Sequence, residues 1–245
     1  MQEFSNMTVR DIAIAAPLTT RVFEEFKIDF CCGGRIPLVE ACENAGIDPA
    51  IVLSKLGTVV EHTGFDGSLR MDRRSQSELI DFIVSTHHAF TRDELRRLAP
   101  LMDKVAGKHG DSHPELISIQ GLFRELADDL MPHMMKEENV LFPYIGQLER
   151  AQASRRSAPF PYFGTVQNPV RMMMSEHEAA GDILRQIRAL STDYSAPTEA
   201  CPSYLALYAG IEDLERDLHK HIHLENNILF PTAIATEAFL NSNKN

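Results

Sequence analysis

Apolar residues recur three and four positions apart along most of the chain, which is the spacing of one face of an α-helix. Few stretches alternate apolar and polar residues as strands do. Ser75 and Glu78 form a capping box at the start of the first of four long amphipathic segments, which are expected at 76–105, 114–148, 169–190 and 203–239. Four such helices predict an antiparallel four-helix bundle.

The N-terminal part of the chain, 1–56, has a different pattern, in which short helical segments alternate with turns. Thr8 precedes one segment as a cap, and Gly46 ends another segment that opens near Pro37. Positions 57–74 contain glycine, are charged and lack periodicity, which indicates a linker. The sequence therefore predicts an all-α protein with a small helical domain at 1–56, a linker at 57–74 and the bundle at 75–245.

Two segments of the predicted bundle repeat each other. HMMKEENVLFP begins at His133, and HIHLENNILFP begins 88 positions later at His221. Apolar residues lead into both segments at the same offset, so His133, Glu137, His221 and Glu225 all lie on core-facing stripes. Burying a Glu there is costly unless it is paired, protonated or bound to metal. Side chains four apart project together, so each His and Glu pair could hold a metal ion.

The other two long helices also repeat. STHHAFTRDEL at 85–95 matches MSEHEAAGDIL at 174–184, which aligns His88 with His177. His87 is the rival of His88, and the repeat favours His88. Each half of the bundle thus offers two His and one Glu, and together the candidate metal ligands are His88, His133, Glu137, His177, His221 and Glu225.

Four His and two Glu suit a binuclear centre. If both carboxylates bridge, an octahedral ion keeps about two open positions, as expected of non-haem iron. Structural zinc usually prefers a closed tetrahedral site, often with Cys. Iron is the first choice, with manganese or zinc as replacements.

Several other histidines and acids have ordinary explanations. His109 with His113 and His219 with His223 are also four apart, and both pairs are expected to be exposed. Glu176 lies beside His177 and could accept a hydrogen bond near the metal. Surface charge for solubility is the preferred interpretation of this residue.

Two adjacent cysteines, Cys31 and Cys32, precede a predicted helix start. That position and the nearby Arg35 would lower a thiol pKa. A thiol pair that exchanges electrons, metal or disulfides and a simple buried turn are equally compatible with the sequence. Cys42 and Cys201 are expected to be structural.

Charge and composition narrow the class of protein. The formal net charge of −11 argues against nucleic acid as the main partner, because phosphate binding needs clustered Lys and Arg. No apolar run is long enough to span a membrane. The first residues lack the pattern of a secretory signal, and four cysteines are too few for a disulfide scaffold. A cytoplasmic protein is therefore expected.

In this order, FKIDFCCGG at 26–34, HMMKEENVLFP, SEHEAAG at 175–181 and HIHLENNILFP resemble the bacterial repair-of-iron-centres family, the di-iron iron–sulfur cluster repair proteins. The resemblance implies a hemerythrin-like bundle behind a small, ScdA-like helical domain that contains cysteine. It implies a centre of two non-haem irons with oxo and carboxylate bridges, on the six ligands named above. The family's vicinal cysteines match Cys31 and Cys32, a candidate thiol transfer pair.

The resemblance also implies a function. Family members rebuild clusters damaged by nitric oxide or oxidants, so damaged iron–sulfur proteins are the expected partners and supply of iron is the expected activity. Two alternatives stay open: a di-iron nitric oxide reductase, and a binding protein that senses nitric oxide or oxygen. Pairing into a homodimer also stays open.

One departure from the oxygen-carrying hemerythrins bears on that choice. Those proteins place a further His one turn after a ligand, whereas Arg92 follows His88 by four and Gly181 follows His177 by four. Fewer His ligands imply more labile irons, which favours reaction or metal release over reversible oxygen storage.

Overall fold

The computed structural model describes residues 4–63 and 70–242. It divides the chain into two compact units, which are Met1–Ile80 with Leu148–Ala158 and His219–Asn245, and Asp81–Gln147 with Pro159–Leu218. Apart from one isolated bridge between Thr8 and Pro37, the regular structure of the described residues is helical. The predicted all-α class is confirmed. None of the described helices has the length and apolarity needed to cross a bilayer.

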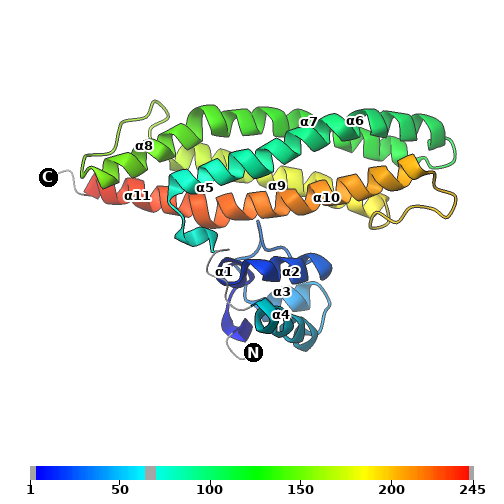
Figure 1. Cartoon of the computed structure of the whole chain (residues 1–245), viewed down its shortest axis with the longest axis horizontal. Coiled ribbons are helices and arrows are strands. Elements are labelled where there is room, and N and C mark those ends of the chain that lie inside the picture. The colour runs from blue at the N-terminus through cyan, green and yellow to red at the C-terminus, as the bar shows by residue number, and fades with distance from the viewer. Residues whose placement is uncertain (1–3, 64–69, 243–245) are drawn as a thin grey trace. The chain divides into compact units, whose positions relative to one another are not determined.

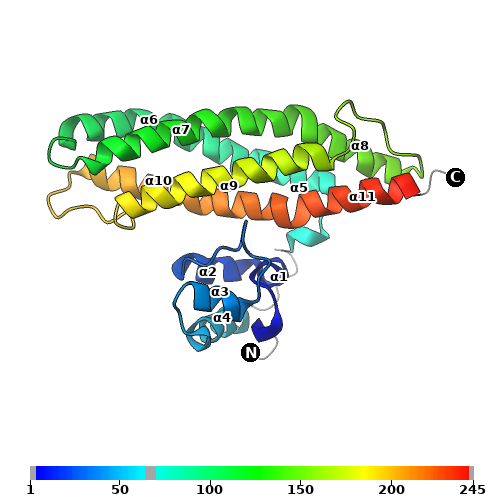
Figure 2. The same cartoon turned by 180° about the vertical axis from the view of Figure 1, so that it is seen from behind.

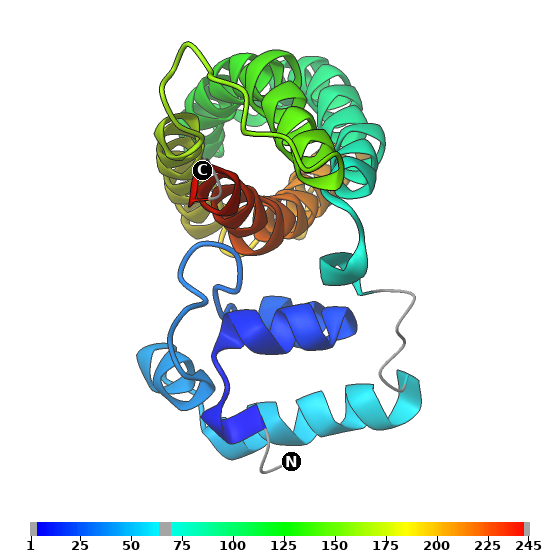
Figure 3. The same cartoon turned by 90° about the vertical axis from the view of Figure 1, so that its left-hand side faces the viewer.

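The second unit contains the four-helix bundle. Its long helices are α6 (Ala89–His109), α7 (Glu115–Lys136), α9 (Gln167–Leu190) and the part of α10 (Pro202–Leu224) up to Leu218. They run lengthwise beside one another in Figures 1 and 2 and surround a common axis in the end-on view of Figure 3. The predicted bundle is therefore confirmed.

The bundle is closed by a core of residues from all four helices. Its members share the three- and four-residue spacing and include Leu98, Met102, Ile119, Phe123, Leu126, Leu184, Ile187, Leu207, Ile211 and Leu214. One buried acid, Glu215 of α10, interrupts this apolar set. Arg188 of α9 bonds it at 2.6 Å, and the Tyr194 hydroxyl donates to it at 2.8 Å. The buried charge is therefore compensated.

Three of the long helices contain a turn of π-helix. η5 (Ile83–His88) joins α5 (Gln76–Phe82) to α6, η6 (Glu137–Leu141) joins α7 to α8 (Phe142–Ala153), and η7 (Glu225–Leu229) joins α10 to α11 (Phe230–Ser242). Single π-turns inside α-helices are rare and concentrate at functional sites. All three begin or end at a predicted metal ligand, whereas His177 lies within the regular helix α9.

The first unit contains the short helices α1 (Val9–Ala15), α2 (Thr20–Glu25), α3 (Leu38–Asn44) and α4 (Pro49–Thr63), with 3-10 turns η1 (Phe4–Asn6), η2 (Pro17–Thr19) and η4 (Met71–Arg73). Thr8 caps α1 as expected, since its hydroxyl accepts from the amide of Asp11 at 3.1 Å. Their common core includes Ile12, Phe23, Phe30, Leu38, Val52, Leu56 and Ile222.

The segment expected as a linker is partly helical. α4 continues to Thr63, well into the range 57–74, and η4 occupies Met71–Arg73. The linker residues 64–69 lie outside the described residues. The capping box after them is confirmed, because the Ser75 amide donates to Glu78 at 2.8 Å and the Glu78 amide donates to the Ser75 hydroxyl at 3.2 Å. The division into two domains stays a prediction.

Candidate metal centre

Four of the predicted ligands form a buried cluster in the second unit. His88 ends η5, His133 lies in the last turn of α7, Glu137 opens η6 and His177 lies midway along α9. One oxygen of Glu137, Oε2, lies 3.3 Å from Nε2 of His88 and 3.4 Å from Nε2 of His133. The Nε2 atoms of His133 and His177 are 3.0 Å apart. These side chains therefore converge on one place inside the bundle.

The far side of two imidazole rings is held by carboxylates. Nδ1 of His88 lies 2.6 Å from Oε1 of Glu138, and Nδ1 of His133 lies 2.8 Å from Oε2 of Glu176. A carboxylate accepts, so each Nδ1 carries the proton and each Nε2 presents its lone pair inward, a tautomer inferred from the hydrogen-bond network. This is the arrangement that metal-ligating histidines usually have.

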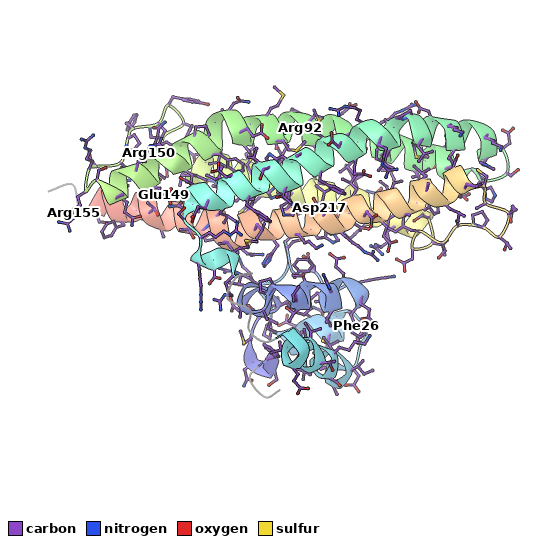
Figure 4. All side chains as sticks on the ribbon, viewed as in Figure 1. Phe26, Arg92, Glu149, Arg150, Arg155 and Asp217 are labelled. Atoms are coloured by element: carbon purple, nitrogen blue, oxygen red, sulfur yellow. The ribbon has the colours of Figure 1, made fainter. Side chains whose placement is uncertain are left out.

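Two basic side chains keep these outer carboxylates charged. Arg92, labelled in Figure 4, bonds Glu138 at 2.5 Å, and Lys136 bonds Glu176. Partial burial raises the pKa of Glu138 and of Glu176, but hydrogen bonds from His88 and Arg92, and from Lys136 and His133, outweigh it and lower both values.

The role of Glu138 was not foreseen from the sequence, and the preference for Glu176 as plain surface charge was wrong. The available signal was weak: Glu138 directly follows a predicted ligand, and Arg92 lies one helical turn after His88. Acids beside ligands are common on helix surfaces, so only the contact separates these two from the rest.

The structure separates His88 from its rival His87. Nδ1 of His87 lies 3.0 Å from both carboxylate oxygens of Asp217, which Figure 4 labels, and its ring meets Phe82 edge-on. His88 instead faces Glu137 and stacks on Phe142 with ring centroids 5.8 Å apart. The geometry therefore favours His88 as the ligand.

The remaining predicted ligands form a pair in the first unit. His221 lies in the last turn of α10, and Glu225 opens η7. Nε2 of His221 is 3.0 Å from Oε1 of Glu225, and both side chains are buried. The pair repeats the arrangement of His133 and Glu137, as the sequence repeat predicts.

The donor set fits iron. Glu137 and Glu225 are each fully buried, and a buried carboxylate costs several kcal/mol unless a cation compensates it. Inward-facing imidazole nitrogens and carboxylate oxygens are ligands that iron, manganese and zinc accept, and no thiol takes part. The structure thus contains a His and Glu cluster that could bind metal.

The expectation that His219 and His223 are exposed was wrong. His223 is only 5% exposed, and its Nδ1 lies 3.3 Å from the backbone oxygen of Phe30. Burial lowers its pKa to about 4, although the hydrogen bond with Phe30 partly opposes the shift. His219 is half-buried beside Glu24, at 2.8 Å. A segment from the first part of the chain covers this helix face, which local periodicity does not predict.

The other pair is also less exposed than expected. His109 is half-buried with its Nε2 3.2 Å from Sγ of Cys201, and His113 is half-buried beside Glu115. Neither contacts the cluster, so neither belongs to the candidate centre.

The two adjacent cysteines lie in a tight loop. All four cysteines are free, and Sγ of Cys31 is 3.7 Å from Sγ of Cys32. Asp29 organises the loop, because its Oδ1 accepts the amides of Cys31 and Cys32, each at 2.9 Å. Gly34 is needed there, since a Cβ would meet the backbone oxygen of Phe30 at 2.8 Å.

The expected lowering of the thiol pKa was wrong for Cys31. A hydrogen bond with Cys32, burial and the charge of Asp29 raise the pKa of Cys31 well above its usual value. Cys31 is buried and Cys32 is exposed, so the two thiols differ in access as well. Asp29, Cys31 and Cys32 also place three ligand-type atoms within 4.8 Å of one another.

Both parts of the chain match known protein families. Residues 79–233 match the hemerythrin HHE cation binding domain, and residues 5–60 match the ScdA_N family, described as a domain of unknown function (DUF542). The chain is 32% identical over 222 residues to "Iron-sulfur cluster repair protein ScdA" of Staphylococcus haemolyticus, covering 91% of this chain and 95% of the relative.

Two further relatives are similar over nearly their whole length. "Probable iron-sulfur cluster repair protein" of Haemophilus influenzae is 33% identical, with 94% of this chain and 98% of the relative covered. "Iron-sulfur cluster repair protein YtfE" of Musicola paradisiaca is 34% identical, with 96% and 99% covered. The chain therefore belongs to the family of iron–sulfur cluster repair proteins, and its bundle to the hemerythrin HHE cation binding domains.

Proposed function

We propose that this protein repairs damaged iron–sulfur clusters by supplying iron from a two-iron centre. The names of its relatives support the repair function. The observation that carries the centre is the convergence of His88 and His133 on one buried oxygen of Glu137, with His177 beside them. We propose as ligands His88, His133, Glu137, His177, His221 and Glu225.

Helix continuity supports the inclusion of the pair from the first unit. Leu207, Ile211, Leu214 and Leu218 of α10 belong to the bundle core, and the next members of that three- and four-residue series are His221 and Glu225. One matched cation binding domain, at 79–233, also includes all six ligands. Both facts support a single centre with two equivalent halves.

The ligand set favours release of iron over permanent retention. Four His and two Glu would hold two irons with few protein ligands each, so positions would remain for solvent or a small ligand. Arg92, one turn after His88, bonds Glu138, and Gly181, one turn after His177, has no side chain. Neither position adds the further His that oxygen-carrying hemerythrins have. When bound, the irons would supply a cargo of metal and a place for nitric oxide or oxygen to bind.

Cys31 and Cys32 are the proposed transfer pair. Cys32 is exposed and can meet a damaged iron–sulfur protein, while Cys31 adjoins it in the same loop. Four free cysteines also support a reducing, cytoplasmic setting, where thiols persist without disulfides.

The decisive experiment supplies the iron-loaded protein to a [4Fe–4S] enzyme inactivated with nitric oxide. We expect faster recovery of that enzyme's activity than with the same concentration of free ferrous iron. Glu137→Ala should abolish the advantage, and Glu125→Ala, at an exposed acid of the preceding helix α7, should retain it. Recovery no better than with free iron would contradict repair. Nitrous oxide formed over many turnovers would instead indicate a reductase.

A further inference from the structure

Two buried amides hold the loop that carries the adjacent cysteines, residues 29–34, here called the cysteine loop. Nδ2 of Asn227 donates to the backbone oxygens of Phe30 and Cys31, at 3.1 and 3.2 Å. Nδ2 of Asn226 lies 3.5 Å from the backbone oxygen of Cys31. Both asparagines are buried within the first unit, where they bond the carbonyls of Phe30 and Cys31, and His223 also contacts the Phe30 carbonyl.

Further contacts fix Asn227 itself. Arg10 of α1 donates to its backbone oxygen at 3.2 Å, and His223, one turn earlier, lies 3.0 Å from its side-chain nitrogen. The His223 ring meets Phe30 edge-on, with centroids 5.5 Å apart. Asn227 is thus the centre of a buried polar network, and such networks are sensitive to the loss of one member.

Asn227 belongs to the same π-turn as a proposed metal ligand. η7 begins with Glu225, and Asn227 follows two residues later. Glu225 pairs with His221, whereas Asn227 points to the cysteine loop. Because one short turn of backbone carries both side chains, a shift of the backbone at Glu225 moves Asn227 with it.

The repeat provides a natural comparison. Asn139 occupies the matching place in η6, 88 positions before Asn227, but it is exposed and donates to the backbone oxygen of Met135 in its own helix, at 2.7 Å. Asparagine at the same place in the same kind of turn therefore bonds only its own helix in one copy and bonds a distant loop in the other.

We propose that Asn227 is a positioning residue that keeps the cysteine loop closed while metal holds Glu225 in place, and that releases the loop when the metal leaves. The proposal rests on the proposed function, because it takes Glu225 as a metal ligand. A loaded chain then keeps Cys31 covered, and a chain that has given up its iron exposes that thiol. The accessibility of Cys31 thereby depends on whether the centre holds metal.

The size of the expected change in loop opening follows from the hydrogen bonds that are lost. Loss of two amide–carbonyl bonds changes the loop-opening equilibrium by roughly tenfold or more. Opening also frees Cys31 from burial, one of the two largest causes of its raised pKa. Its reaction with an alkylating agent should accelerate accordingly.

The test is a brief pulse of iodoacetamide on the full chain at one fixed pH, with each cysteine quantified by mass spectrometry. Elemental analysis of the same samples gives their iron content. Cys32, exposed in the same loop, is the reference for intrinsic reactivity, and the fully buried Cys42 reports unfolding. We compare wild type with and without iron, Asn227→Ala, and the matched control Asn139→Ala.

We expect removal of iron from wild type to raise labelling of Cys31 relative to Cys32 by about tenfold, with Cys42 unlabelled. Iron-loaded Asn227→Ala should label Cys31 as fast as iron-free wild type, and Asn139→Ala should match wild type. Equal labelling of Cys31 in loaded wild type and loaded Asn227→Ala would overturn the proposal. So would equal labelling of wild type with and without iron, a comparison that needs no variant.

The two readouts separate this proposal from the one on which it rests. If elemental analysis finds no bound iron, both the proposed function and the control of the loop by metal are contradicted. A chain that binds iron but shows no change in labelling of Cys31 keeps the proposed function and loses only the role of Asn227.

Discussion

The two copies of the repeated segment, 133–143 and 221–231, agree on the face that is buried with the ligands and differ on the opposite face. Both place a His and a Glu four residues apart at a π-turn, with ring nitrogen and carboxylate oxygen 3.4 and 3.0 Å apart. On the outer face, Met131, just before the first copy, and Met135 within it are exposed, while their counterparts His219 and His223 are half-buried and buried. The predicted ligands constrain the residue types on one face, and the segment that packs against the helix determines the residue types on the other.

The largest expected effect concerns the shared face. Glu137→Ala and Glu225→Ala should each weaken iron binding by more than about 100-fold, because loss of a ligand costs more than loss of a group behind it. Elemental analysis and ferrous iron titration against a chelator would measure this, with about two irons per chain expected in wild type. Loss in only one variant would show that the two copies contribute unequally.

The next effect concerns the support behind the ligands. Glu138→Gln should weaken iron binding by about 10–100-fold, since His88 loses a charged acceptor at Nδ1. The matching position of the second copy is already an amide, Asn226. The same titration measures the change, and Glu178→Gln, an exposed acid beside His177, is the control. An unchanged affinity would show that Glu138 does not orient the ring.

The outer faces should differ in their contribution to stability. His223→Ala should lower the free energy of unfolding by about 2–3 kcal/mol, because it leaves a cavity and removes a buried hydrogen-bond partner of Phe30. Met135→Ala, at the matching exposed position, should change it by less than about 0.5 kcal/mol. Denaturant unfolding of the iron-free protein is the measurement. Equal changes would mean that the coverage of the second copy adds no stability.

The smallest effect is expected at the half-buried position. His219→Ala should cost about 0.5–1 kcal/mol, as a partly exposed contact with Glu24 is worth little. Met131→Ala should be close to neutral, on the same unfolding assay. If His219→Ala lowered the free energy of unfolding as much as His223→Ala does, the expected difference between the two positions would be contradicted.

Much of this comparison was predictable from the sequence. The spacing of apolar residues placed the four long helices to within a few residues at most ends, and the repeat put a His and a Glu on each buried stripe. His88 was preferred to His87 on the register alone, and it is His88 that faces Glu137. The helices and the buried positions were predictable because they depend on local periodicity and on the cost of burying charge, whereas metal binding by these residues stays a prediction.

What was missed depends on contacts between distant segments. Burial of His223 comes from Phe30, 193 positions away, and the carboxylate behind His133 comes from another helix. The hydrogen bond with Cys32 and burial, with a smaller contribution from Asp29, raise the pKa of Cys31, against the lowering expected from Arg35 and a helix start. Each π-turn shifts the apolar pattern by a single residue, which is hard to recognise in a spacing that already alternates between three and four.

Those turns have a consequence for the length of the chain. A π-turn accommodates one residue more than the same turn of α-helix, so deleting one residue from 225–229 would restore an ordinary helix with no loss of backbone hydrogen bonds. If all five residues were kept and the turn became ordinary α-helix, every later residue would be rotated by about 100° around the axis. Phe230, Ala233 and Leu240, now buried, would then turn away from their core. The wider turn thus corrects the phase of the helix, and the orientation of the residues beyond it depends on that turn.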